Sequence, residues 1–217
     1  MNKGKFSWEE FYKVPIVGIV RNLGIDQVKT ILPIYIEAGL STIEITMNTP
    51  SAAEIINYSI NNYGDQLNIG AGTVCNLDDL EEALAAGSQF IVTPIIDKKV
   101  IKRCVKKDIP VFPGAYTPTE IYKAWKWGAS IVKVYPATSL KSGYIKDIKA
   151  PLNQIKLLPT GGVSLDNIAS FMKGSDGLGI GGQLFDKKLI ESEDWTGLKK
   201  HFGEYVKAIK ETINGQL

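Results

Sequence analysis

A lysine interrupts an apolar run in the second half of the chain, and it is the strongest candidate for chemistry. The run reads IVKVYP over 131–136, so Lys133 stands in the middle of a segment typical of a buried β-strand. Lysine is almost never fully buried unless another group pairs with it or a reaction uses it. Burial disfavours the ammonium form and lowers the pKa, so the free amine becomes available as a nucleophile. Such an amine can condense with a ketone to form a Schiff base, which withdraws electrons from the neighbouring carbon.

A glutamate stands in a similar position in another strand-like run. The run STIEIT covers 41–46, and by alternation Glu44 shares one face with Thr42 and Thr46. One interpretation is a buried ion pair between Lys133 and Glu44 that only satisfies two charges. Buried ion pairs are weak devices for stability compared with apolar replacements, so we favour a functional role for both residues. The carboxylate would then move protons during the reaction.

Two glycine pairs occur late in the chain, each after a strand-like run. Gly161 and Gly162 lie in PTGGVS, and Gly181 and Gly182 lie in GIGGQLF. Glycine lets backbone N–H groups approach phosphate oxygens closely, and the last two loops of a parallel barrel commonly bind phosphate. The alternative is a pair of ordinary tight turns, since turns use glycine freely. The occurrence of both pairs in these two loops favours a phosphate site.

The elements that must position these residues follow a repeating pattern of short β-branched runs and helical segments. Eight runs span 15–20, 41–46, 67–72, 89–94, 109–114, 130–135, 155–160 and 176–181, at a spacing of about 20–26 residues. This pattern predicts an α/β fold, a (β/α)8 TIM barrel, as one domain over residues 1–217. An open Rossmann-like sheet is the alternative, but RNLGID follows the first run where a G-x-G-x-x-G loop would be required.

Local signals predict where several helices begin. The SWEE motif at 7–10 resembles a capping box and predicts a short extra helix before the first strand, which would close the bottom of the barrel. Further N-caps are predicted at Asp26, Thr49 with Pro50, Asp97, Thr117 and Ser164. The final helix is predicted over 195–213.

In a parallel barrel, catalytic and binding groups lie at the carboxyl ends of the strands and in the loops that follow. This rule adds substrate-binding candidates to Lys133, Glu44 and the glycine pairs. They are Arg21, Asn48, Thr73, Pro94, Tyr135 and Thr160. Tyr135 and Pro94 would shape the pocket beside the lysine, although either could be ordinary core filling.

Composition narrows the class of protein. A net charge of +2, from 25 basic and 23 acidic residues, is too balanced for a nucleic-acid-binding surface. The single histidine, His201, argues against a histidine-rich metal site and a Ser-His-Asp triad, so we expect no metal and no cofactor. We also expect no signal peptide and no membrane span. Two cysteines without a metal or redox motif fit a reducing cytoplasm.

Several motifs together resemble one known family over nearly the whole chain. They are IEIT with Glu44, GAGTV at 70–74, VTP at 92–94, FPG at 112–114, VKVYPA with Lys133, PTGGV and GIGG. In this order they closely resemble the 2-keto-3-deoxy-6-phosphogluconate and 4-hydroxy-2-oxoglutarate aldolase family. In motif detail the chain is most similar to the 2-dehydro-3-deoxy-6-phosphogalactonate branch.

The resemblance implies a metal-independent class I aldolase on a (β/α)8 barrel, usually a homotrimer. It would cleave a 2-keto-3-deoxy-6-phospho sugar acid to pyruvate and glyceraldehyde 3-phosphate. Lys133 would match the Schiff-base lysine, Glu44 the general acid/base, and Thr73 a residue that contacts the substrate carboxylate. The two glycine pairs would match the phosphate-binding backbone.

One departure concerns the position four residues after the glutamate. The phosphogluconate-type members typically have arginine there, whereas this chain has Asn48. The galactonate-type members resemble this chain in that stretch, and they carry an arginine at the end of the first strand, as Arg21 does here. We therefore favour the galactonate substrate over the gluconate one. Three alternatives remain open from the residues: a sugar-phosphate isomerase or epimerase, a non-catalytic phosphosugar-binding barrel, and an aldolase for an unphosphorylated hydroxy-keto acid.

Overall fold

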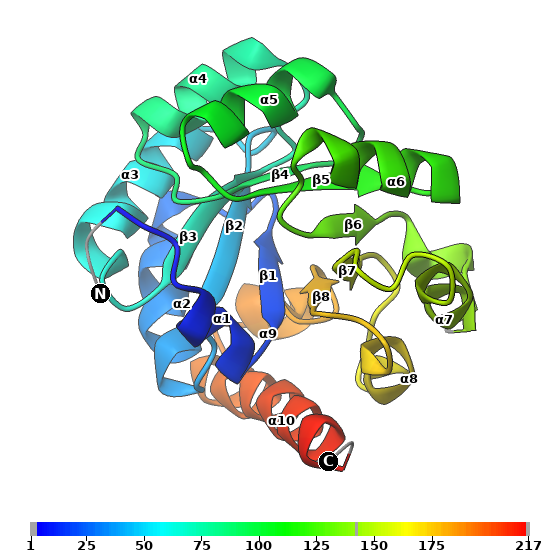
Figure 1. Ribbon diagram of the computed structural model, residues 1–217. Coiled ribbons are helices and arrows are strands. Elements are labelled where there is room, and N and C mark those ends of the chain that lie inside the picture. The colour runs from blue at the N-terminus through cyan, green and yellow to red at the C-terminus, as the bar shows by residue number, and fades with distance from the viewer. Residues whose placement is uncertain (1–3, 142, 216–217) are drawn as a thin grey trace.

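Eight parallel strands form the centre of the molecule, and helices surround them (Figure 1). The computed structural model describes residues 4–141 and 143–215, and the strand bounds below refer to these residues. The strands are β1 (Ile16–Val20), β2 (Thr42–Thr46), β3 (Asn68–Gly72), β4 (Ile91–Thr93), β5 (Val111–Ala115), β6 (Val132–Val134), β7 (Leu157–Pro159) and β8 (Leu178–Ile180). Each lies inside or next to one of the eight runs predicted from sequence, so the predicted (β/α)8 barrel is confirmed.

The helices alternate with the strands along the chain. They are α1 (Trp8–Lys13), α2 (Ile25–Glu37), α3 (Ala52–Tyr63), α4 (Leu77–Ala85), α5 (Lys98–Lys106), α6 (Pro118–Trp127), α7 (Gly143–Lys149), α8 (Ile168–Met172), α9 (Lys187–Glu191) and α10 (Trp195–Asn214). A short 3-10 helix, η1 (Ala137–Ser139), follows β6. The long α10 packs against α2, α8 and α9 on the outside of the barrel.

Strand order follows the chain, from β7 through β1 to β8. Each strand pairs in parallel with its neighbours, so all the carboxyl ends meet at one rim. An isolated parallel bridge between Thr160 and Gly179 joins the two outer strands of this order and closes the ring. The rim that results is where the sequence places the candidate catalytic residues.

Aromatic side chains fill the interior at the end where the strands begin. Phe90 and Phe112 point inward there, with ring centroids 5.4 Å apart. Phe6, from the segment before α1, lies 5.2 Å from Phe90, and Phe11 of α1 is fully buried in the same cluster. The extra N-terminal helix predicted from sequence is therefore present, and it closes this end of the barrel with apolar surface.

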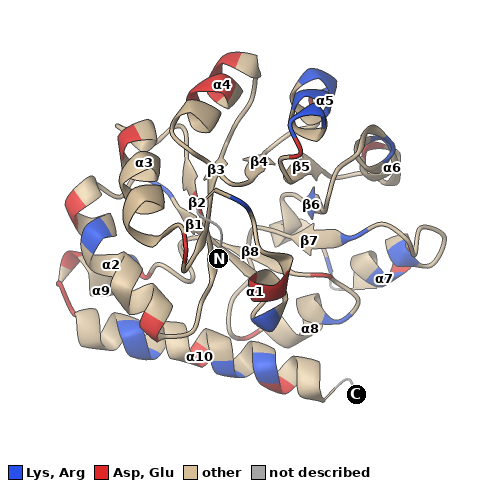
Figure 2. Ribbon diagram, turned by 60° about the vertical axis from the view of Figure 1, so that its left-hand side comes forward, with Lys and Arg blue, Asp and Glu red and all other residues tan. Residues whose placement is uncertain are grey.

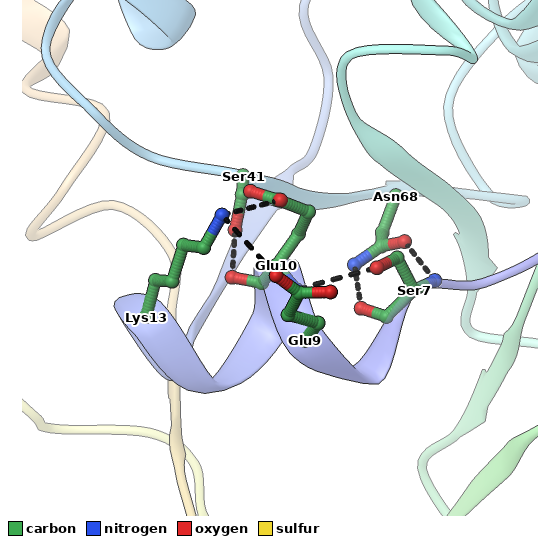
Figure 3. Close-up of polar contacts among 6 residues, drawn as sticks. All are labelled: Ser7, Glu9, Glu10, Lys13, Ser41 and Asn68. Atoms are coloured by element: carbon green, nitrogen blue, oxygen red, sulfur yellow. Dashed lines mark hydrogen bonds and ion pairs between the residues drawn. The ribbon is translucent and has the colours of Figure 1, made fainter. Parts of the chain in front are cut away.

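Hydrogen bonds fasten this closing segment to the first strands (Figure 3). The Ser7 amide donates to Asn68 Oδ1 at 2.6 Å, and Asn68 Nδ2 donates back to the Ser7 carbonyl at 2.9 Å. The Ser41 hydroxyl donates to the Glu10 carbonyl at 2.8 Å. Ser7 caps α1 by accepting from the Glu10 amide, but its own amide bonds to Asn68, and the Glu10 carboxylate pairs with Lys13 instead. The predicted capping box is thus half formed.

Some of the helix N-caps predicted from sequence are confirmed, and others are wrong. Asp97 and Thr117 cap α5 and α6 as predicted, and Thr117 forms a full capping box with Glu120. The predicted caps at Asp26, Thr49 and Ser164 are wrong. Asp26 lies inside α2, Ser51 stands at the start of α3, and Asn167 precedes α8. The Thr49 hydroxyl instead accepts a hydrogen bond from the distant Asn22 amide at 3.0 Å.

Charged side chains are spread over the outer helices, with the densest group of Lys and Arg on α5 (Figure 2). The buried face of α5 consists of Val100, Ile101 and Cys104. The Lys and Arg residues of α5 therefore lie on the solvated face of an amphipathic helix. No helix in the described part of the chain is both long enough and apolar enough to cross a membrane.

Candidate active site

Lys133 lies in the short strand β6 and points into the barrel near its carboxyl rim. It pairs with Gly114 on β5 and with Leu158 on β7, and only 4% of its surface is exposed. Its partner on the neighbouring strand β5, Gly114, has no side chain. The Nζ atom lies 5.1 Å from the centre of the Tyr135 ring, which brings the predicted tyrosine beside the lysine.

Glu44 enters the same interior from β2. It pairs with Ile19 and Gly70, and 1% of its surface is exposed. Gly72 lies so close that a Cβ atom there would be 2.7 Å from the Glu44 carboxyl carbon. Among the described residues, neither carboxylate oxygen has a hydrogen-bond partner. An unpartnered buried carboxylate is costly, and ionisable groups of this kind are concentrated at functional sites.

The interpretation of Lys133 and Glu44 as a contacting ion pair is therefore not what the structure contains. Glu44 accepts no hydrogen bond from Lys133 or from any other described group. The two charges act on each other only through the space between them.

Burial shifts the pKa of both groups toward their neutral forms. Loss of hydration lowers the pKa of Lys133, and the Arg21 guanidinium lowers it further, while the Glu44 charge partly opposes this shift. Loss of hydration raises the pKa of Glu44, against the partial opposition of Lys133 and Arg21. A lysine with a lowered pKa is a better nucleophile near neutral pH, and a glutamate with a raised pKa exchanges protons there more readily.

A cavity of about 770 Å³ opens from Lys133 to the surface at this rim. Eight of the residues predicted as functional line it: Arg21, Lys133, Tyr135, Thr160, Gly161, Gly162, Gly181 and Gly182. The volume suits a small-molecule ligand. Arg21 places a permanent positive charge at the edge of the cavity, where it can bind an anionic group with two hydrogen bonds.

The two glycine loops form one wall of the cavity. Gly161 and Gly162 have φ angles of 94° and 73°, a left-handed conformation that favours glycine. A Cβ atom on Gly162 would lie 2.9 Å from the Thr138 Cα atom. The amides of Gly162, Gly182 and Gln183 donate to no other described group, so they remain available to an anion.

The remaining predicted residues lie outside the cavity lining. Asn48 is exposed after β2, Thr73 is half-buried with a φ angle of 58°, and Pro94 is half-buried after β4. Glu44 is buried and is not among the residues that line the cavity. Their roles in binding remain predictions.

Several residues at the site were not identified from sequence. Thr138, five positions after Lys133, packs against the Gly161–Gly162 turn and lines the cavity. Gly72 makes room for the Glu44 side chain, and Gly114, the strand partner of Lys133, lies so close to the Thr93 and Pro94 carbonyls that a Cβ atom would not fit. Their inward parity on β3 and β5 was a usable signal, because glycine in a strand often marks a close approach.

Comparison with known proteins agrees with the family resemblance of the sequence motifs. The family model KDPG and KHG aldolase matches residues 9–201 of the chain. The chain belongs to the KDPG and KHG aldolase family. A 2-dehydro-3-deoxy-6-phosphogalactonate aldolase of Escherichia coli is 33% identical to this aldolase over 93% of the chain and 97% of the relative. A 2-dehydro-3-deoxy-phosphogluconate aldolase of Haemophilus influenzae is 36% identical over 88% and 92%.

A solved structure described as native KDPGal matches the fold of this aldolase over 97% of the chain and 99% of the neighbour. The TM-score is 0.87 and the identity is 30%. The described residues of this aldolase contain no group of three or more His, Cys, Asp or Glu side chains that could hold a metal ion. The chain is a lyase, and the ionisable side chains that line its cavity include the Lys133 amine and the Arg21 guanidinium.

Proposed function

We propose that this aldolase cleaves a 2-keto-3-deoxy-6-phospho sugar acid to pyruvate and glyceraldehyde 3-phosphate through a Schiff base on Lys133. The observation that carries the proposal is the buried Lys133 amine at the base of an open cavity, with an unpartnered Glu44 carboxylate in the same interior. A lysine without a counter-ion in contact is destabilised as an ammonium, and this supports its use as a nucleophile.

In the proposed reaction, the neutral Lys133 amine attacks the C2 ketone, and loss of water gives an iminium ion. Glu44, through a water molecule, removes the proton from the C4 hydroxyl. The C3–C4 bond then breaks, its electron pair moves into the iminium, and glyceraldehyde 3-phosphate leaves. The resulting enamine is protonated at C3, and water releases pyruvate and restores the amine. Each proton that is taken up is returned, so the cycle needs no redox partner.

The two ends of the substrate have separate binding groups in this proposal. Arg21 would bind the carboxylate bidentately, with Thr73 as a second contact. Tyr135 and Pro94 would shape the pyruvate half of the pocket, and Thr160 would stand between the halves. The free amides of the two glycine loops would bind the phosphate, together supplying several charge-assisted hydrogen bonds.

We favour the galactonate configuration at C4 because Arg21 and Asn48 resemble that branch. The identities of the two relatives, 33% and 36%, do not separate the two substrates. Assays with both C4 epimers, and with 4-hydroxy-2-oxoglutarate as a third substrate, decide the preference. A higher kcat/KM for the gluconate epimer would overturn our choice.

The first experiment is reduction with borohydride in the presence of pyruvate, followed by mass spectrometry of the intact protein and its peptides. We expect one reduced pyruvyl adduct on Lys133 and none in Lys133→Ala. No adduct in the wild type, with sugar phosphates still bound, would contradict the aldolase mechanism. That outcome would favour an isomerase or a phosphosugar-binding protein instead.

We also propose that the protein is one barrel domain that forms a homotrimer in the cytoplasm, as the family resemblance implies. The outer face of α6 supports an assembly, because Tyr122 and Trp125 are 42% and 36% exposed there. Aromatic side chains on an outer helix are typical of surfaces that another subunit covers. Light scattering coupled to size-exclusion chromatography would measure the mass; a monomer would refute the trimer.

A further inference from the structure

The loop between β8 and α9 is held from behind by the C-terminal helix. The Gln183 carbonyl oxygen accepts two hydrogen bonds, one from the Tyr205 hydroxyl and one from His201 Nε2, each 2.9 Å long. Because a carbonyl can only accept, Nε2 of His201 carries the proton. The single histidine of the chain thus contacts the backbone of the residue directly after the Gly181–Gly182 pair.

Both donors belong to one rigid element. His201 and Tyr205 are four residues apart on α10, on the same face of the helix. Their rings lie edge to face with centroids 5.2 Å apart, and Tyr205 is 1% exposed. Because α10 packs against α2, α8 and α9, the position of the two donors is set by packing outside the β8–α9 loop.

The other side of the same loop faces the cavity. Gly182 and Gln183 both line it, and their amides donate to no described group. The Gly181 carbonyl closes the turn by accepting from the amides of Leu184 and Phe185 at 2.8 and 3.0 Å. The Gly181 and Gln183 carbonyls are therefore bonded to the protein, and the Gly182 and Gln183 amides are free for a ligand.

A glycine pair without such anchoring would sample many conformations, and ordering it would reduce the affinity for an anion. Two hydrogen bonds to one carbonyl fix the orientation of the peptide group between Gln183 and Leu184. They restrict the turn before it as well. We propose that His201 and Tyr205 are positioning residues that preorganise the β8–α9 loop for the substrate phosphate. This inference rests on the proposed function, in which that loop binds phosphate.

A purely structural role is the competing explanation, since Tyr205 is also part of the core. The two explanations differ in which part of the substrate is affected. Loss of preorganisation weakens binding of the phosphate and leaves the chemistry at Lys133 unchanged. General loosening of the barrel lowers every activity together.

The variants are Tyr205→Phe and His201→Phe, which keep the rings and remove the donors, and the double variant. Tyr35→Phe is the matched control. Tyr35 is another fully buried tyrosine that donates to a carbonyl, that of Thr42 at 2.7 Å, and its ring stacks on Phe185 near the same helices. Thermal unfolding identifies variants folded at the assay temperature; His201, only half-buried, provides the test if Tyr205→Phe does not fold.

We expect KM for the phosphorylated substrate to rise about fivefold in each single variant, the effect of one neutral hydrogen bond. We expect kcat, the trapping of pyruvate and kcat/KM for the unphosphorylated analogue to stay within about twofold of the wild type. Tyr35→Phe should leave the preference for the phosphorylated substrate unchanged. Equal losses for both substrates, or no change in KM, would overturn the proposal.

Calorimetric titration with inorganic phosphate separates this inference from the proposed function. We expect weaker phosphate binding by the double variant than by the wild type, whether or not the wild type cleaves the sugar acid. If the wild type cleaves the substrate but binds phosphate no better than the double variant, the positioning role of His201 and Tyr205 is refuted and the proposed aldolase activity is retained. If the wild type binds phosphate better than the double variant but cleaves no substrate, the positioning role is retained and the proposed aldolase activity is refuted.

Discussion

The close approach of Gly72 to Glu44 allows the position of the carboxylate to be tested by one methyl group. In Gly72→Ala, the new Cβ atom would lie 2.7 Å from the Glu44 carboxyl carbon and 3.2 Å from its Cγ. Carbon atoms pack at about 3.5–4.0 Å, so the carboxylate must retreat by about 1 Å. A displacement of about 1 Å at a reacting group costs roughly 10²-fold in rate, or about 2.7 kcal/mol of transition-state free energy.

The free energy of unfolding of Gly72→Ala should change much less than its transition-state free energy. The group that must move is the end of a side chain that no hydrogen bond holds, so overpacking costs at the low end of the usual range, about 1 kcal/mol. Replacing glycine by alanine also restricts the unfolded chain, which offsets about 0.4–1 kcal/mol. We therefore expect a folded and nearly inactive variant. Its kcat would be measured with a coupled assay for glyceraldehyde 3-phosphate, and its stability by thermal unfolding.

Gly70→Ala is the matched control, two residues earlier on the same strand. A Cβ atom there would lie 2.6 Å from the Phe90 carbonyl oxygen, which is backbone and cannot move aside. We expect this variant to lose stability first and activity only as the fold is lost. The reasoning about Glu44 would be refuted if Gly72→Ala kept more than about half of the wild-type kcat while folding normally.

Four further predictions concern the site and the closed end of the barrel. Because burial lowers the pKa of Lys133, trapping of pyruvate should increase with pH. Half-maximal trapping should occur at a pH below about 10.4, which is the ordinary pKa of lysine. The Glu44 charge opposes that shift, so Glu44→Gln should move the midpoint further down while lowering kcat for cleavage by about 10²–10⁴-fold; an upward shift would contradict the electrostatics. Thr49→Val removes the acceptor for the Asn22 amide beside Arg21, and KM should rise about fivefold, measured against Thr30→Val as a surface control. Asn68→Ala should lower the free energy of unfolding by about 2–3 kcal/mol with kcat unchanged at 25 °C; a loss of kcat in the folded variant would contradict a purely stabilising role.

The barrel and the buried positions of Lys133 and Glu44 were predictable because both depend on short-range regularities. Alternation within β2 and β6 is enough to place Glu44 and Lys133 on inward faces, and the repeat length is enough to bring their strands into one barrel. The capping box at Thr117 was predictable for the same reason, since all of its hydrogen bonds lie within four residues.

The features that were missed involve residues distant in sequence. Thr49 follows the local pattern of a helix cap, but its hydroxyl bonds to an amide 27 positions away. The contact between Gly72 and Glu44 depends on how β2 and β3 pair, and the contact of Tyr205 with Gln183 depends on how α10 lies against the barrel. The secondary-structure propensities of these residues do not predict either contact. These contacts become visible only when the packed chain is known.

Strand β3 combines two opposite demands within five residues. Asn68 at its start forms hydrogen bonds with Ser7, the residue that caps helix α1. Gly72 at its end has no side chain, which leaves space for Glu44. Strand β5 also changes role along its length, because Phe112 belongs to the aromatic cluster and Gly114 pairs with Lys133. We therefore expect substitutions at the two ends of one strand to alter heat resistance and turnover independently. A substitution two residues earlier or later decides which of the two properties responds.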